Sequence, residues 1–311
     1  MTVLQLTLKL VLFIAVGFVA RKLKVIADGF DKMLSRFLMA LPLPCMIINS
    51  FHIEYSVDYL LNAPILIGLS VGSMVFMFCL VSLCTIKMKD RELRKTVRFT
   101  LLFTNFTFVG LPVVGELFGA EGVFNYVLFT LPIRVMVYGG AAVMLGKGGE
   151  RVNVKETIKK FICEPVVAVF IGFFLYAARI ELPAVLQSTI TSLGGMASPM
   201  GLLLCGVIIA DADLKAILHH PEAIIVSLCR LIAVPIAALG LFLLLGVEHA
   251  RIQNMMYFFA LPVASFTPTF LLRYNPDAVE ARVTAGYIVV VSTMLCVLTI
   301  PAWTMVLDRI L

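Results

Sequence analysis

Polar and helix-breaking residues interrupt a stretch that is apolar enough to lie in lipid, TNFTFVGLPVVGELFG at residues 104–119. Asn105 and Thr107 carry hydrogen-bonding side chains in this stretch. Gly110 and Pro112 disfavour a regular helix, because glycine adds backbone freedom and proline lacks an amide hydrogen. An interrupted membrane helix with polar groups at the interruption is typical of a binding site for a small solute.

Pro112 predicts where this helix breaks. A continuous helix through residues 108–113 is disfavoured, and proline is well suited to the first turn of a helix. We therefore expect a new half-helix to begin at Pro112. The amides of Val113, Val114 and Gly115 would then lack partners within the helix and would point into the break.

A second break is expected at Thr267–Pro268. Threonine is a favoured N-cap residue, and the proline that follows it suits a helix start. The amides of Thr269, Phe270 and Leu271 would then be the free donors.

The two breaks predict a site for an anion. Each helix start carries a partial positive charge and unpaired donors, which suit a carboxylate or a phosphate. Lipid offers no hydrogen bonds, so the two irregular segments should face each other. Asn105 and Thr107, with Ser265 and Thr267 opposite them, would complete the site with side-chain hydrogen bonds. The alternative is that both prolines only kink packed helices.

Two arginines lie inside apolar runs. Arg134 is near the middle of its run, where a charge is costly unless it is paired or hydrated. It is a candidate partner for an anionic substrate, and the alternative is a structural partner for backbone carbonyls. Arg230 lies nearer the end of its run, so we expect its side chain to reach the membrane surface. No acidic pair stands at mid-depth, so no proton relay is predicted.

The composition predicts the elements that must position these residues. Of 311 residues, 61% are hydrophobic and 14% charged, and the mean hydropathy is +1.02, which indicates an integral membrane protein. About 20 helical residues span a bilayer core. The apolar runs predict ten spans, at residues 4–20, 33–51, 59–86, 97–118, 122–146, 160–179, 184–210, 216–247, 252–272 and 281–307. The first of these could be read as a secretory signal, but Lys9 interrupts its start and basic residues follow it, so a retained helix is expected.

Charge and cysteine usage limit the partners. Nineteen Lys and Arg residues fall in the joints after the odd-numbered spans, against three in the opposite joints and the C-terminus. This asymmetry, rather than nucleic-acid binding, explains the net charge of +6, and it predicts that both termini lie on the non-cytoplasmic side of the cell (inner) membrane. The seven cysteines and four histidines form no ligand cluster, so no metal or cofactor is expected.

Weak internal similarity predicts a repeat. A shift of 155 residues places Gly17 over Gly172 and Pro44 over Pro199, and a shift of 156 places Pro112 over Pro268. Each coincidence falls at the same place within corresponding spans. Because each half holds five spans, the second half, residues 159–311, would be inverted relative to the first, residues 1–158.

These motifs resemble those of a known family. The pattern NxxxxGxP at Asn105, Gly110 and Pro112, followed by FGAEG at residues 118–122, resembles the auxin efflux carrier family, as do LPLP in the second span and LTIPAW near the end. The absence of a large central loop is similar to the bacterial branch, where malonate- and malate-type transporters are known.

The resemblance implies a fold akin to the PIN-FORMED auxin carriers and the bile acid:sodium symporters, with helices 4 and 9 broken and crossing at mid-membrane, and with frequent homodimers. It also implies that Asn105 contacts a substrate carboxylate. The repeat pairs Asn105 with Leu261, so a second asparagine contact is not implied.

The sequence as a whole predicts an all-α integral membrane protein of two inverted five-helix repeats. We expect a secondary transporter that moves a small organic anion, a dicarboxylate or an auxin-like acid, by elevator-type alternating access. A membrane-embedded ligand sensor that uses the same pocket is the alternative. A membrane enzyme is disfavoured, because no acid/base or metal cluster is found.

Overall fold

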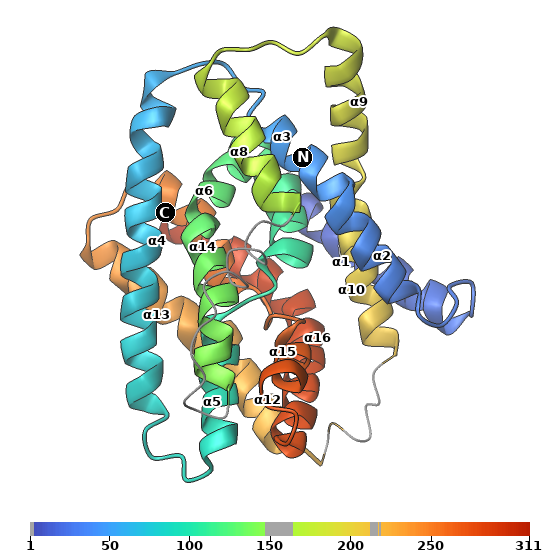
Figure 1. Ribbon diagram of the computed structural model, residues 1–311, viewed down its shortest axis with the longest axis vertical. Helices are drawn as coiled ribbons and strands as arrows, with labels where there is room; N and C mark the ends of the chain where they lie inside the picture. The colour runs from blue at the N-terminus through green and yellow to red at the C-terminus, as the bar shows by residue number, and fades with distance from the viewer. Residues whose placement is uncertain (1–2, 147–163, 212–216, 218) are drawn as a thin grey trace. The chain divides into compact units, whose positions relative to one another are not determined.

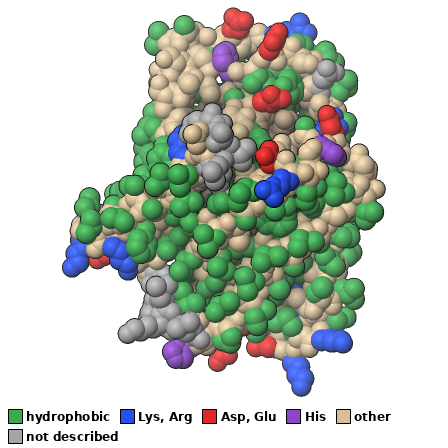
Figure 2. Space-filling model, turned by 180° about the vertical axis from the view of Figure 1, so that it is seen from behind, with side chains coloured by type: hydrophobic (Ala, Val, Ile, Leu, Met, Phe, Trp, Pro, Cys, Tyr) green, Lys and Arg blue, Asp and Glu red, His purple; other side chains and the backbone are tan. Residues whose placement is uncertain are grey.

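The fold is mostly helical in the residues that the structure describes, which are 3–146, 164–211, 217 and 219–311 of a computed structural model. Six helices or kinked helix pairs in this part of the chain are long and apolar enough to cross a membrane. Hydrophobic side chains cover much of the face seen in Figure 2. These features agree with a multi-pass membrane protein, and the arrangement of ten spans in an inverted repeat stays a prediction.

The chain divides into two compact units, each described here by itself. Unit 1 comprises residues 1–69, 107–131 and 162–211, and unit 2 comprises residues 70–106, 132–161 and 212–311. Both units take segments from both halves of the sequence. The predicted repeats, residues 1–158 and 159–311, describe a symmetry along the sequence and stay a prediction.

Unit 1 is built from kinked, closely packed helices (Figure 1). Its elements are α1 (Val3–Lys22), α2 (Phe30–Ala40), α3 (Pro42–Ser50), the first part of α4 (Val57–Cys84), the first part of α6 (Leu111–Leu145), α8 (Glu164–Ala177), α9 (Ala184–Gly195) and α10 (Ala197–Ala210). The α2–α3 kink falls at Leu41, directly before Pro42, and the α9–α10 kink falls at Met196. The helices of the predicted spans 33–51 and 184–210 are therefore kinked.

Glycines allow the close packing of α1 on α10. A Cβ atom on Gly17 would lie 2.2 Å from the carbonyl oxygen of Leu203, and one on Gly206 would lie 2.0 Å from the carbonyl oxygen of Ile14. No larger residue fits at either position without moving a backbone. Small residues thus bring these two apolar helices into backbone contact, as they do in other membrane proteins.

Unit 2 gathers its helices around the long C-terminal helix α16 (Val279–Ile310), which packs against α5, α12, α14 and α15. Its other elements are the second parts of α4 and α6, α5 (Arg91–Leu102), α12 (Pro221–Leu228), η2 (Cys229–Ala233), α13 (Val234–Leu244), α14 (His249–Ala260) and α15 (Thr267–Tyr274). Asp90 caps α5, since its side chain accepts hydrogen bonds from the amides of Glu92 and Leu93.

Two π-helical turns, each placed just before a proline, interrupt the α-helices. η1 (Phe106–Gly110) precedes Pro112 by two residues, and η2 precedes Pro235 by two residues. In an α-helix a proline ring clashes with the carbonyl four residues earlier and offers it no amide. A π-turn widens the helix at that carbonyl and relieves the clash.

The π-turn before Pro112 corrects the predicted position of the first break. The helix already restarts at Phe106, so the interruption lies at residues 103–105 and not at 108–113. Val113, Val114 and Gly115 lie inside a helical run, and their amides do not open into the break as predicted. The sequence reasoning failed because it allowed proline only at a helix start or at a kink.

Candidate functional site

Two helices of unit 2 end in extended backbone. α5 ends at Leu102, and Phe103 after it has φ −112° and ψ 135°. α14 ends at Ala260, and Leu261 after it has φ −79° and ψ 156°. Helical backbone resumes at Phe106 in the first case and at Thr267 in the second. The breaks therefore comprise residues 103–105 and 261–266.

The two extended segments pair with each other. Thr104 and Val263 form an isolated antiparallel β-bridge. Two backbone hydrogen bonds flank the bridge: Asn105 N donates to Pro262 O at 2.9 Å, and Ala264 N donates to Phe103 O at 3.2 Å. The pairing satisfies backbone groups that the breaks remove from the helices, which is required of irregular backbone inside a membrane.

A polar side chain from each break meets at this pairing. Asn105 Nδ2 donates to Ser265 Oγ at 2.7 Å, and Asn105 is buried. The hydroxyl of Ser292, on α16, accepts from the amide of Val263 at 3.1 Å. The structure thus brings together two predicted site residues, Asn105 and Ser265, and adds Ser292 as a support behind them.

Thr267 plays a different part from the predicted N-cap. It is the first residue of α15, and Phe266 occupies the N-cap position. Its hydroxyl donates to the carbonyl of Ala264 at 2.8 Å, and its amide donates to the same oxygen at 3.1 Å. The buried hydroxyl therefore holds the turn that leads into α15.

The start of α15 offers fewer free donors than predicted. The amide of Phe270 donates to the carbonyl of Phe266 at 2.9 Å, and Leu271 lies a full turn inside the helix. Pro268 has no amide hydrogen. Among the described residues, this leaves the amide of Thr269 without a backbone acceptor at this helix start.

Four predicted site residues, Thr107, Gly110, Pro112 and Val113, belong to unit 1. There the carbonyl of Pro112 accepts a hydrogen bond from Ser198 Oγ at 3.2 Å. A Cβ atom on Gly201 would lie 2.6 Å from the ring of Pro112, so α10 passes directly against it. Val113 is 1% exposed and packs in the interior of this unit.

Arg134 is fully buried in unit 2 and lies beside the first break. Its guanidinium carbon is 4.7 Å from the centre of the Phe106 ring, and Phe106 follows Asn105 directly. A cation over an aromatic face is attracted by the negative face of the ring. The contact places a positive charge in the interior next to the polar pair of the break.

Arg230 is a residue that the sequence reasoning misjudged. Its side chain does not reach the membrane surface but is 0% exposed. Nη1 donates to the carbonyl of Leu101 at 2.9 Å, and Nη2 donates to the carbonyl of Phe258 at 3.1 Å. The sequence does contain a sign of this role, because Arg230 lies in an apolar run five residues before Pro235. A charge so close before a proline marks a place where the helix is irregular.

The comparison with known families identifies the class of protein. The family model described as "Membrane transport protein" matches residues 2–304, nearly the whole chain. The chain belongs to this family, which is that of the auxin efflux carriers. The resemblance carried by Asn105, Gly110 and Pro112 is thereby confirmed. A search of curated proteins gives no match.

Membership of the membrane transport protein family fixes the broad function. The family is one of membrane transporters and not of enzymes. Within the described ranges, no group of three His, Cys, Asp or Glu side chains could hold a metal ion.

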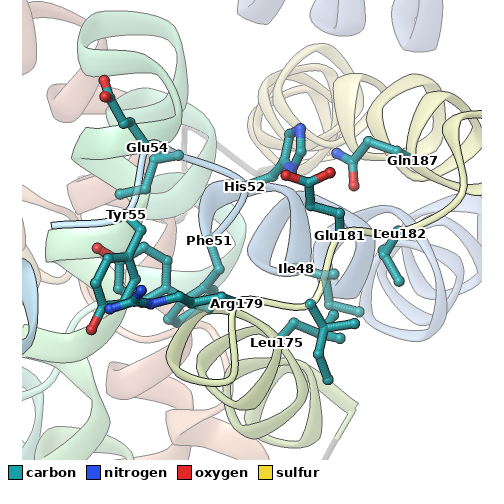
Figure 3. Close-up of a pocket in the computed structure, with 13 residues that line it drawn as sticks. Ile48, Phe51, His52, Glu54, Tyr55, Leu175, Arg179, Glu181, Leu182 and Gln187 are labelled. Carbon is teal, nitrogen blue, oxygen red and sulfur yellow. The ribbon is translucent and has the colours of Figure 1, made fainter.

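A hollow lies in unit 1, where α3 and α8 end and α9 begins (Figure 3). Its volume is about 410 Å³, and its charged residues are His52, Glu54, Arg179 and Glu181. The guanidinium of Arg179 stacks on the ring of Tyr55 at 3.9 Å. Charges of both signs line this hollow at the ends of helices, so it suits an anion less well than the breaks do.

Proposed function

We propose that this membrane transport protein is a secondary carrier of a small organic anion, and that the anion binds at the paired breaks. The observation that carries the proposal is the hydrogen bond between Asn105 and Ser265 at the point where two broken helices pair. The buried amide of Asn105 and the partly buried hydroxyl of Ser265 can turn from each other toward a carboxylate, and a hydrogen bond to a charged group is stronger than the neutral one it replaces.

The electrostatics around the breaks support an anionic substrate. Arg134 supplies a buried positive charge over the ring of Phe106, the residue that follows Asn105. The amide of Thr269 and the N-terminal end of α15 add a partial positive charge. A dicarboxylate or an auxin-like acid carries the carboxylate that these donors would bind.

The division of the chain supports elevator-type alternating access. Within the described ranges, the chain passes between the units at residues 69–70, 106–107 and 131–132, and two further passages involve residues outside these ranges. Gly68 and Gly72 flank the first passage, the π-turn η1 contains the second, and Pro132 lies at the third. Irregular or glycine-containing helix is where a chain bends most easily, so these passages would allow one unit to move relative to the other.

The setting of the carrier is part of the same proposal. The distribution of basic residues supports a cell (inner) membrane location with both termini on the non-cytoplasmic side. Two breaks at repeat-related places support the inverted repeat with crossing helices. Assembly into a homodimer follows from the family resemblance alone.

Counterflow into proteoliposomes tests transport directly. Purified protein is reconstituted with unlabelled malonate, malate or an indole acid inside, and uptake of the labelled anion is followed. A carrier exchanges label for unlabelled substrate, whereas a sensor binds the same anion without exchange. Binding that is never accompanied by counterflow would therefore replace the carrier with a sensor.

Alanine variants of Asn105 and Ser265, with a matched asparagine control, test the site. Asn105→Ala and Ser265→Ala should each weaken anion binding about 10- to 100-fold, because each removes a hydrogen-bonding group that can meet a charge. Asn49→Ala is the control, since Asn49 also bonds two side chains, Gln187 and Thr191, but lies outside the breaks. Dissociation constants from thermal-shift titration give the readout, and equal affinity in all three variants would move the site elsewhere.

A further inference from the structure

Arg230 supplies hydrogen bonds to both helices at the ends where they break. Leu101, which accepts from Nη1, is in the last turn of α5, and Phe258, which accepts from Nη2, is in the last turn of α14. The last four carbonyls of an α-helix have no partner within the helix. One buried guanidinium therefore binds one such carbonyl from each helix.

The two carbonyls are those that lose their helical donors at the breaks. In a continuous helix the carbonyl of Leu101 would accept from the amide of Asn105, which here donates to Pro262 instead. The carbonyl of Phe258 would accept from residue 262, which is a proline and has no amide hydrogen. Arg230 thus replaces two donors, one that the pairing of the breaks has taken and one that Pro262 lacks.

The charge of Arg230 matters as much as its hydrogen bonds. Each helix C-terminus carries about half a negative charge, and α5 and α14 bring two such ends to one guanidinium. In carriers with broken helices, unwound carbonyls and C-terminal helix ends commonly bind a coupling sodium ion. Arginine keeps its charge under all ordinary conditions, so it neutralises the two ends permanently.

The surrounding structure holds Arg230 in this place. It lies in the π-turn η2, and the indole Nε1 of Trp303 donates to the carbonyl of the next residue, Leu231, at 2.8 Å. In a regular helix the carbonyl of Leu231 would accept a hydrogen bond from the amide of residue 235. Pro235 has no amide hydrogen, so Trp303 supplies the donor instead. The irregular turn is therefore held at the residue that follows the arginine.

We propose that Arg230 is a tethered cation that joins the two helix ends at the breaks and stands where a coupling sodium ion would otherwise bind. Anion binding by this chain is then independent of sodium. The first statement concerns the fold of unit 2 alone, whereas the second rests on the proposed function. Arg230 is a positioning residue, because it acts on the site through the helix ends.

The first experiment uses no anion. Thermal unfolding of the full-length protein is measured for the wild type, Arg230→Ala, Arg230→Met and Arg230→Lys, with and without about 20 mM guanidinium chloride at constant ionic strength. Arg282→Ala is the control, because Arg282 is a partly exposed arginine of the same unit whose hydrogen bond to the carbonyl of Pro276 lies at the surface. We expect Arg230→Ala to unfold about 5 to 10 °C lower and to regain about half of this loss with guanidinium.

The other variants separate charge from packing. Methionine fills the space without charge, so Arg230→Met should stay destabilised and should not respond to guanidinium. Lysine keeps the charge but not the two-pronged geometry, so Arg230→Lys should fall between the wild type and Arg230→Met. A Met variant as stable as the wild type would overturn the proposal, and so would an Ala variant that guanidinium does not stabilise. If the Ala variant cannot be purified, the unfolding temperatures of the Met and Lys variants decide. A Lys variant more stable than the Met variant supports the proposal, and the reverse order overturns it.

The second experiment compares sodium with choline in the wild type. Anion affinity and counterflow should be equal in the two salts, and a dependence on sodium of tenfold or more would overturn the statement on coupling. Absence of all anion binding would count against the proposed function and leave the guanidinium result standing. Anion binding without guanidinium rescue would leave the proposed function standing and count against the role of Arg230.

Discussion

The two buried arginines of unit 2 differ in what they contact. Arg230 donates to two backbone carbonyls, and its hydrogen bonds serve the ends of helices. Arg134 lies over the ring of Phe106, next to the polar pair of the first break. A guanidinium donates hydrogen bonds in its own plane, so contact of its face with an aromatic ring does not compete with them. Arg134 is therefore the arginine that we expect to meet substrate.

Replacement of Arg134 tests this expectation. Arg134→Gln should weaken binding of a carboxylate about 100-fold or more, because a hydrogen bond to a charged group is lost. Binding of the neutral amide analogue of the same compound should change much less. Titration of both ligands against the same variant gives the comparison. An equal loss for the charged and neutral ligands would assign Arg134 a structural role.

At the scale of the helices, close packing fixes the element that carries Pro112. α10 passes Pro112 at Gly201, where a Cβ atom would lie 2.9 Å from the carbonyl oxygen of Phe108 as well as against the proline ring. Phe108 is the residue four before Pro112, whose carbonyl the proline cannot bond. The absence of a side chain at Gly201 lets a neighbouring helix cover that carbonyl.

Two glycines in one short stretch make a matched test of this packing. Gly201→Ala should lower the free energy of unfolding by about 1 to 3 kcal/mol, because neither a proline ring nor a backbone carbonyl can move aside cheaply. Gly195→Ala should be neutral or slightly stabilising, because a Cβ atom there meets nothing within 4 Å. Thermal unfolding of the two variants in detergent compares them, and equal midpoints would show that the contact at Gly201 is unimportant.

Sequence patterns predicted which helices break and failed on where the breaks lie. The apolar runs and the prolines identified both interrupted helices, because the missing amide of proline is a property of one residue. The position of the first break depends on the π-turn η1, which shifts it five or more residues before Pro112. No local pattern reports the width of a helical turn, so this detail was not predictable.

Long-range partners were likewise beyond the sequence. Lys9 and Glu116 fall in different predicted spans, and in unit 1 their side chains form an ion pair of 2.6 Å. The partners of Arg230 are carbonyls 129 and 28 residues away, which no spacing rule predicts. The cost of a buried charge indicated that partners exist, but only the packing of helices determines which they are.

For the whole molecule, the compact units and the sequence halves describe different properties. Each unit takes segments from both halves, so the predicted repeat, if present, is interwoven and does not form two separate bodies. Orientation in the membrane is a further property of the whole chain. It depends on basic residues spread over all the joints, and no single element determines it.

Two exposed positions test the orientation. In a cysteine-free background, Glu248→Cys should react with a membrane-impermeant maleimide on intact cells, because it lies in a predicted outer joint. Lys89→Cys lies in a joint rich in basic residues and should react only after permeabilisation. Both native residues are exposed, so neither result reflects burial. The reverse pattern would place both termini in the cytoplasm.

The β-bridge between Thr104 and Val263 makes the site sensitive to register. Side chains alternate across extended backbone, so Thr104 and Asn105 point to opposite sides of the first break. A slip of one residue between the two segments would present a threonine hydroxyl to Ser265 in place of the asparagine amide. Inserting or deleting a single residue in either short segment would therefore exchange the polar group at the pairing while leaving every helix intact, a simple route by which related chains could come to select different solutes.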